Sequence, residues 1–148
     1  MREPKSAQPE DESLVRSVAR ALWTLGRPAA AERFDGNRLD RRDPAFIAEL
    51  LPAFRHLNRS YLRLRTAGLA HLPRGPALYV ANHNGGIMGP DLAATLGTLW
   101  DALGVEHPLY ALAHDFAMRQ MPPLGRLLQR FGAVRASPDN ARALLATG

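Results

Sequence analysis

One stretch decides the fold that the sequence predicts: Ala77-Leu78-Tyr79-Val80-Ala81-Asn82-His83-Asn84-Gly85-Gly86-Ile87-Met88-Gly89-Pro90-Asp91. Its apolar beginning, residues 77–81, is typical of a buried strand. The polar, glycine-rich turn that follows holds His83, and Gly89-Pro90-Asp91 then opens a helical pattern. Because open α/β folds usually place their chemistry at the carboxyl end of a strand, this turn is the first candidate for a functional site.

Each residue of the turn also has a purely structural interpretation. His83 would then be a hydrogen-bonded loop residue, and the glycines would supply positive φ angles. Pro90 and Asp91 suit the first turn of a helix, where proline fits and the helix dipole favours a carboxylate. In combination, however, a titratable base, a neighbouring amide, backbone N–H donors and a carboxylate in one turn indicate an acyl-transfer site.

Strand and helix patterns alternate on the C-terminal side of this stretch. We expect helices over residues 92–103, 122–132 and 137–146, and strands over residues 109–113 and 133–136. This alternation predicts an α/β fold with a mostly parallel sheet flanked by helices. Because the last helix ought to feed a further strand, we expect the domain to be truncated at its C-terminus.

Helical patterns dominate the N-terminal side. An amphipathic helix is expected over residues 14–25, and a second one from the N-cap Asp43 to about Asn58, with a kink or early break at Pro52. The alternation of apolar and charged residues over 61–66 then predicts a strand. We therefore divide the chain into a disordered tail (1–12), an N-terminal helical region (13–59) and a partial catalytic domain (60–148).

The charge of the chain is uneven. The net charge of +5 comes almost wholly from arginine, and no acidic residue lies between Glu49 and Asp91. Such a region attracts anions such as phospholipid headgroups or a nucleotide-bearing cofactor. Nucleic acid would also be attracted, but we expect no nucleic-acid partner, because the sequence has no zinc-finger, RNA-recognition or helix-turn-helix signature. The basic residues of this region are Arg55, Arg59, Arg63, Arg65 and Arg74.

Composition also narrows the chemistry and the location. The chain has no cysteine, which excludes thiolate catalysis and cysteine-ligated metal, and we expect no metal site. No stretch approaches the ~20 apolar residues that span a bilayer. The N-terminus lacks the apolar core of a signal peptide. We therefore expect a cytoplasmic protein that associates peripherally with the inner face of the cell membrane.

Two blocks of sequence resemble a known family. The run Gly68-Leu69-Ala70-His71-Leu72-Pro73-Arg74-Gly75-Pro76-Ala77-Leu78-Tyr79-Val80-Ala81-Asn82-His83 is similar to the first motif region of the glycerolipid acyltransferase superfamily. The later Met121–Leu128, followed by Phe131–Arg135, is similar to its second block. Residues 61–148 thus resemble the N-terminal half of the domain found in 1-acylglycerol-3-phosphate acyltransferase. The third motif of the superfamily, a proline-glutamate-glycine segment, is absent from the chain.

The resemblance implies transfer of a fatty acyl group from an acyl-CoA or acyl carrier protein thioester to a glycerolipid hydroxyl such as that of lysophosphatidate. No further cofactor is implied. His83 would be the general base. Arg135 would bind the acceptor phosphate. The remaining residues that the resemblance places at the substrate are Asn82, Asn84, Gly85 and Gly86.

One departure from the motif leaves the partner of the histidine open. The superfamily usually has an aspartate at the position of Met88, whereas the first carboxylate here is Asp91. Asp91 is the first candidate to orient the imidazole, and Asp115 is the alternative acid. A different function also stays open, namely a non-catalytic module that binds anionic lipid through Arg55, Arg59, Arg63 and Arg65.

Overall fold

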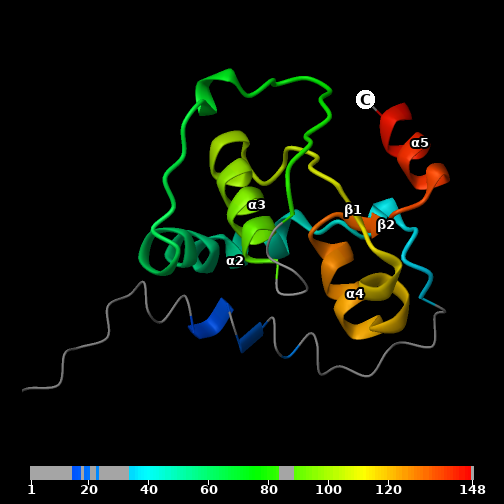
Figure 1. The fold of residues 1–148 in the computed structure, drawn as a ribbon. Helices are drawn as coiled ribbons and strands as arrows, with labels where there is room; N and C mark the ends of the chain where they lie inside the picture. The colour runs from blue at the N-terminus through cyan, green and yellow to red at the C-terminus, as the bar shows by residue number, and fades with distance from the viewer. Residues whose placement is uncertain (1–14, 18, 21–22, 24–33, 84–88, 148) are drawn as a thin grey trace, which may run out of the picture.

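The computed structural model describes residues 15–17, 19–20, 23, 34–83 and 89–147 (Figure 1). These residues are mostly helical and include one small sheet. The α-helices and strands are α2 (Pro44–His56), α3 (Pro90–Leu103), β1 (Ala111–Ala113), α4 (Pro122–Arg130), β2 (Ala133–Arg135) and α5 (Pro138–Ala146). The other elements are the 3₁₀ turns η1 (Leu39–Arg41) and η3 (Leu69–His71) and the π-helical turns η2 (Leu57–Tyr61) and η5 (Phe116–Gln120).

The sheet is a parallel pair of strands, β1 and β2, in which Leu112 lies opposite Val134. The connection between the strands contains η5 and α4, and α4 packs against β2 (Figure 1). Gly132 makes the turn from α4 into β2 with a φ of 88°, and a Cβ at this position would lie 2.5 Å from the carbonyl oxygen of Leu109. The predicted strands over 109–113 and 133–136 are therefore present, although shorter.

The helix α2 shows how strongly local sequence determines this part of the fold. The side chain of Asp43 accepts a hydrogen bond from the backbone N–H of Phe46 (2.9 Å), and Pro44 occupies the first helical position. Of the two alternatives predicted at Pro52, a kink or an early break, the break does not occur, because the helix continues to His56 and is followed by the π-helical turn η2. Its apolar face is buried on the N-terminal side of the proline, and this packing holds the helix together. The buried residues are Phe46, Ile47, Leu50 and Leu51.

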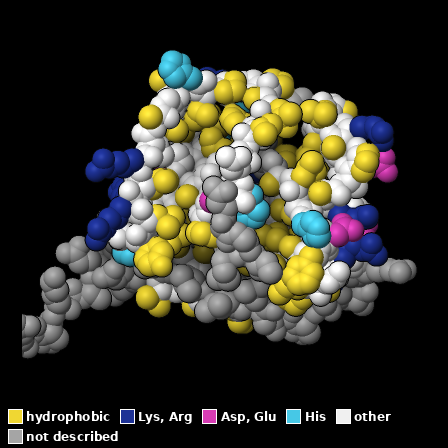
Figure 2. All heavy atoms as spheres, in the orientation of Figure 1, with side chains coloured by type: hydrophobic (Ala, Val, Ile, Leu, Met, Phe, Trp, Pro, Cys, Tyr) yellow, Lys and Arg dark blue, Asp and Glu magenta, His cyan; other side chains and the backbone are white. Residues whose placement is uncertain are grey.

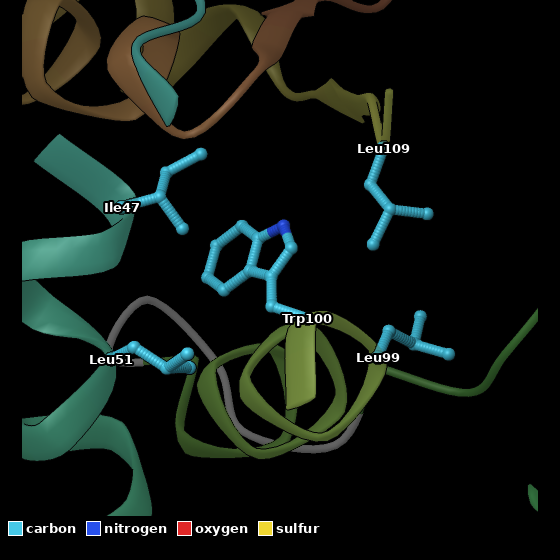
Figure 3. Packing of buried hydrophobic residues seen from close by; sticks show 5 residues of the cluster. All are labelled: Ile47, Leu51, Leu99, Trp100 and Leu109. Atoms are coloured by element: carbon cyan, nitrogen blue, oxygen red, sulfur yellow. The ribbon is translucent and has the colours of Figure 1, made fainter. Parts of the chain in front are cut away.

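The core lies between α2, α3 and the segment that leads into β1. Trp100 of α3 is 1% exposed and points into the space between Ile47 and Leu109 (Figure 3). Its indole stacks on Phe131 at a centroid distance of 5.9 Å and meets the edge of Phe54 at 5.6 Å. The helices α2 and α3 and the segment that leads into β1 thus share one hydrophobic core.

Two predicted strands are wrong. Residues 77–83 have no regular secondary structure, and Leu78 and Val80 are 77% and 86% exposed. Residues 62–68 are also irregular, with Arg63 at a φ of 49°. Both segments have the sequence pattern of a strand, but a strand also needs a neighbour for its backbone hydrogen bonds. Among the described residues, neither segment pairs with β1 or β2.

The N-terminal helix lies against α2 through polar contacts. Residues 15–17, 19–20 and 23 are helical, and the buried Ser17 hydroxyl donates to the backbone carbonyl of Glu49 (2.6 Å). The predicted apolar face is not buried where it is described, because Val15 and Trp23 are 66% and 61% exposed. The other members of that face, and the tail 1–12, lie outside the described residues. None of the helices in the described ranges combines the length and apolar character of a membrane-crossing helix.

Candidate functional site

The structure brings two of the predicted site residues into contact. The imidazole Nδ1 of His83 lies 2.9 Å from the carboxylate Oδ2 of Asp91. His83 stands at the end of the irregular segment 77–83, and Asp91 is the second residue of α3. The His83 side chain is 60% exposed and the Asp91 side chain 28% exposed. The histidine side chain is therefore accessible to a ligand, while the carboxylate is more buried than the imidazole.

Local sequence explains the position of the carboxylate. Gly89 has a φ of 51° and precedes Pro90, which starts α3. The backbone N–H of Ala93 donates to the Gly89 carbonyl (3.0 Å) and closes the first helical turn. Asp91 consequently sits in the first turn of α3, where the helix dipole favours a negative charge. Asp91 therefore fits both interpretations from the sequence. It is a carboxylate in the first turn of a helix, and it lies within hydrogen-bonding distance of His83.

The contact has a chemical consequence for the imidazole. An ionised carboxylate can only accept a hydrogen bond, so Nδ1 of His83 must donate to it. The neutral ring then carries its lone pair on Nε2. A carboxylate that orients a histidine in this way is the arrangement that general-base catalysis uses.

Asp115 and Arg135, predicted in different roles, form a second pair. The Nε of Arg135 donates to Oδ1 of Asp115 (2.6 Å), and a guanidinium nitrogen of Arg119 lies 3.9 Å from the other carboxylate oxygen. Arg135 ends β2 and Asp115 follows β1 closely, so the pair lies at the carboxyl edge of the sheet. The imidazole of His83 is thus oriented by Asp91, while Asp115 holds Arg135.

The other predicted substrate residues are only partly described. Asn82 precedes His83 in the exposed segment. Asn84, Gly85 and Gly86 lie outside the described residues. Within the described ranges, no cluster of three or more histidine or acidic side chains has the geometry to hold a metal ion.

The basic region predicted from the sequence is largely exposed. Its exposed arginines are Arg59, Arg63, Arg65 and Arg74. Leu78 and Val80, later in the same stretch of the chain, are exposed as well. Arg55 differs from these arginines, because its guanidinium is bound to Asp101 of α3 at 2.6 Å. In Figure 2 many hydrophobic side chains gather on the visible face, with arginine or lysine side chains at its edges.

The sequence analysis gave no indication of a surface pocket that lies between α4 and the segment 34–41. Arg126, Gln129 and Arg130 line this pocket from one side. Their spacing of three and four residues places them on one face of a helix, and this was the available signal.

Comparisons with known proteins give distant relatives. No family model matches the chain, and no solved structure matches it. One uncharacterized protein of Mycobacterium bovis and two of Mycobacterium tuberculosis are each 32% identical to it over 112 residues. The match covers 72% of this chain and 30% of each relative. The chain is thus similar to proteins whose function is not established, and spans less than a third of their length.

Proposed function

We propose that this chain belongs to a glycerolipid O-acyltransferase in which His83 is the general base. The observation that carries this proposal is the 2.9 Å contact between His83 Nδ1 and Asp91 Oδ2. The contact supplies an oriented and accessible imidazole in a segment whose sequence resembles the first motif of that superfamily. Asp91 would replace the aspartate that the motif usually has at the position of Met88.

The proposed reaction begins when Nε2 of His83 takes the proton of the acceptor hydroxyl. The oxygen attacks the thioester carbonyl carbon of acyl-CoA or acyl-acyl carrier protein, and a tetrahedral oxyanion forms. The carbon–sulfur bond then breaks, and the leaving thiolate takes the proton from the imidazolium. Asp91 keeps Nδ1 protonated throughout and stabilises the imidazolium. Arg135 would bind an acceptor phosphate such as that of lysophosphatidate, and this phosphate would take the place of Asp115 as its hydrogen-bond partner.

In the proposed enzyme, β1 and β2 belong to an α/β domain with a mostly parallel sheet flanked by helices. Two features support this: the parallel pairing of β1 with β2, and the exposed apolar run Leu78–Val80, which would be covered in a larger domain. We place this enzyme in the cytoplasm, peripherally on the inner face of the cell membrane.

The first prediction concerns acyl transfer from a radiolabelled acyl-CoA to lysophosphatidate by the full-length protein. His83→Ala should lower kcat by roughly 10²- to 10⁴-fold, the usual contribution of a general base. His71→Ala is the matched control, since His71 is an exposed histidine of η3, and it should leave the rate unchanged. Retained activity in His83→Ala, with native circular dichroism, would disprove the proposal.

A second function is favoured by a separate observation, namely that residues 59–80 carry both exposed arginines and exposed apolar side chains. Arg63, Arg65 and Arg74 would bind lipid phosphates while Leu78 and Val80 enter the interface. This module would bind anionic membranes without any catalytic step.

Vesicle flotation provides the second prediction. The double variant Arg63→Glu/Arg65→Glu should lose binding to phosphatidylglycerol vesicles, and salt should weaken the native interaction. Arg142→Glu on α5 is the matched control, because Arg142 is exposed and lies outside the basic region. Equal binding to neutral and anionic vesicles would contradict this function.

A further inference from the structure

The strand β1 has an open edge. The N–H of Ala111 donates to the Gly132 carbonyl (3.1 Å). The Ala113 carbonyl accepts from the N–H of Ala136 (2.8 Å), so Ala111 and Ala113 both face β2. Successive residues of a strand direct their backbone groups to opposite sides, and those of Leu112 therefore face away from β2. Within the described ranges β1 pairs with β2 alone, and the N–H and carbonyl of Leu112 have no partner.

This edge lacks the protection that natural sheets usually have. The outer edge of β2 is covered, because the N–H of Arg135 donates to the Gly36 carbonyl (2.8 Å). Open edges are commonly protected by charged side chains or by proline. The three residues of β1 are instead apolar, and the Leu112 side chain is 50% exposed. An edge of this kind can receive a further strand through its backbone hydrogen bonds.

The same chain carries a segment with the properties of such a strand. Residues 77–81 are all exposed, and Leu78 and Val80 are 77% and 86% exposed. In the part of the chain that the structure describes, the backbone groups of this segment have no hydrogen-bond partner. The segment holds no charged residue and is rich in residues that favour strands. One molecule thus has both an open strand edge and an unpaired, strand-like segment.

One parallel register matches the two surfaces. When Ala81 lies opposite Ala113, Val80 lies opposite Leu112, and these two exposed apolar side chains share one face of the sheet. The N–H of Leu112 then donates to the Tyr79 carbonyl, and its carbonyl accepts from the N–H of Ala81. Both unpaired backbone groups of Leu112 are satisfied in this register.

The charges that precede the two segments favour the same register. It places Arg74 opposite Glu106, and both residues are exposed. Glu106 also attracts the guanidinium of Arg42, but none of the described residues forms a salt bridge with Arg74 or Glu106. Opposite charges on neighbouring strands stabilise their pairing. An antiparallel strand would place Arg74 at the other end of β1, away from Glu106.

We propose that this chain forms a homodimer in which residues 77–81 of each copy pair with the outer edge of β1 in the other copy. The segment does not pair with β1 of its own chain, whereas a second copy supplies both matching surfaces. Each copy gives one strand and receives one, so the contact has two-fold symmetry and closes on itself. The pairing leaves both faces of the sheet open to the helices of a larger domain. The inference does not depend on acyl transfer.

Sedimentation velocity of the purified chain, over a wide range of concentration, tests the dimer. The native chain should shift from monomer to dimer as its concentration rises. Val80→Lys should weaken dimerisation about tenfold, because a charge then lies beside Leu112 at both contacts. Leu145→Lys is the matched control, since Leu145 is 71% exposed on α5, and it should dimerise like the native chain.

A charge-swap experiment distinguishes a second copy from pairing within one chain. Arg74→Glu and Glu106→Arg should each weaken dimerisation about tenfold, because like charges then meet at both contacts. A mixture of the two variants should associate like the native chain, since opposite charges meet again at both contacts of the mixed dimer. The proposal is overturned if this mixture associates no better than either variant alone. It is also overturned if the native chain stays monomeric, which would leave the edge to the chain's own segment or to another protein.

Discussion

At the scale of single residues, Asp43 combines two functions. Its carboxylate caps α2 through the Phe46 N–H and pairs with Arg130 of α4 at 2.6 Å. Burial alone would raise the pKa of this carboxyl group. The hydrogen bond from Phe46 and the Arg130 guanidinium lower it by more, and the net pKa lies below its usual value.

The third prediction follows from the sign of this shift. A carboxyl group whose pKa is lower in the folded state stabilises the fold above its unfolded pKa, about 3.9. This contribution disappears as the pH falls through the lower folded pKa. Asp43→Asn keeps a side chain that can cap the helix but removes the charge. Its free energy of unfolding, measured in urea from pH 7 to pH 3, should fall less steeply than that of the native protein. Parallel curves would contradict the prediction.

At the scale of elements, helix boundaries depend on contacts between residues close in sequence, whereas strands depend on contacts between residues far apart in sequence. Helix boundaries could be predicted where the capping residue contacts residues within a few positions of itself. Asp43 and Ser137 begin α2 and α5 in this way, and Gly104 ends α3. The run 77–81 has the composition of a buried strand, but no described neighbour pairs with it. The same reasoning applies to the site. Asp91 was recognisable from its place at a helix start, whereas the Asp115–Arg135 pair required knowing that β1 and β2 are adjacent.

The fourth prediction compares two leucines from these contrasting elements. Leu109 is 5% exposed and precedes β1, so Leu109→Ala should lower the free energy of unfolding by about 2–5 kcal/mol. Leu78 is 77% exposed, so Leu78→Ala should change it by less than about 0.5 kcal/mol. Urea unfolding of both variants measures the difference. A large loss in Leu78→Ala would mean that residues 77–81 are buried as a strand after all.

At the scale of the whole molecule, a short early segment fastens distant parts together. The N–H of Asp43 donates to the Arg130 carbonyl (3.0 Å), and the N–H of Arg135 donates to the Gly36 carbonyl (2.8 Å). Between them, Arg42 donates to the carbonyls of Val105 and His107. Residues 36–43 thus connect β2, the end of α4 and the turn after α3.

The fifth prediction tests this connection. Arg42→Gln should lower the free energy of unfolding by about 1–3 kcal/mol, because two backbone carbonyls lose a charged donor. The neighbouring Arg41→Gln changes an exposed side chain and serves as the control, with an expected change within about 0.5 kcal/mol. Equal stabilities of the two variants would show that Arg42 does not hold these segments together.

The bond between Asp43 and Arg130 also has a consequence for biosynthesis. A chain emerges from the ribosome from its N-terminus, so α2 is made long before the residues that hold its first turn in place. Its apolar face, with Phe46 and Ile47, must wait in the nascent chain until Trp100, Arg130 and Phe131 have been synthesised. During that interval the apolar face of the nascent helix has none of the partners that cover it in the folded protein.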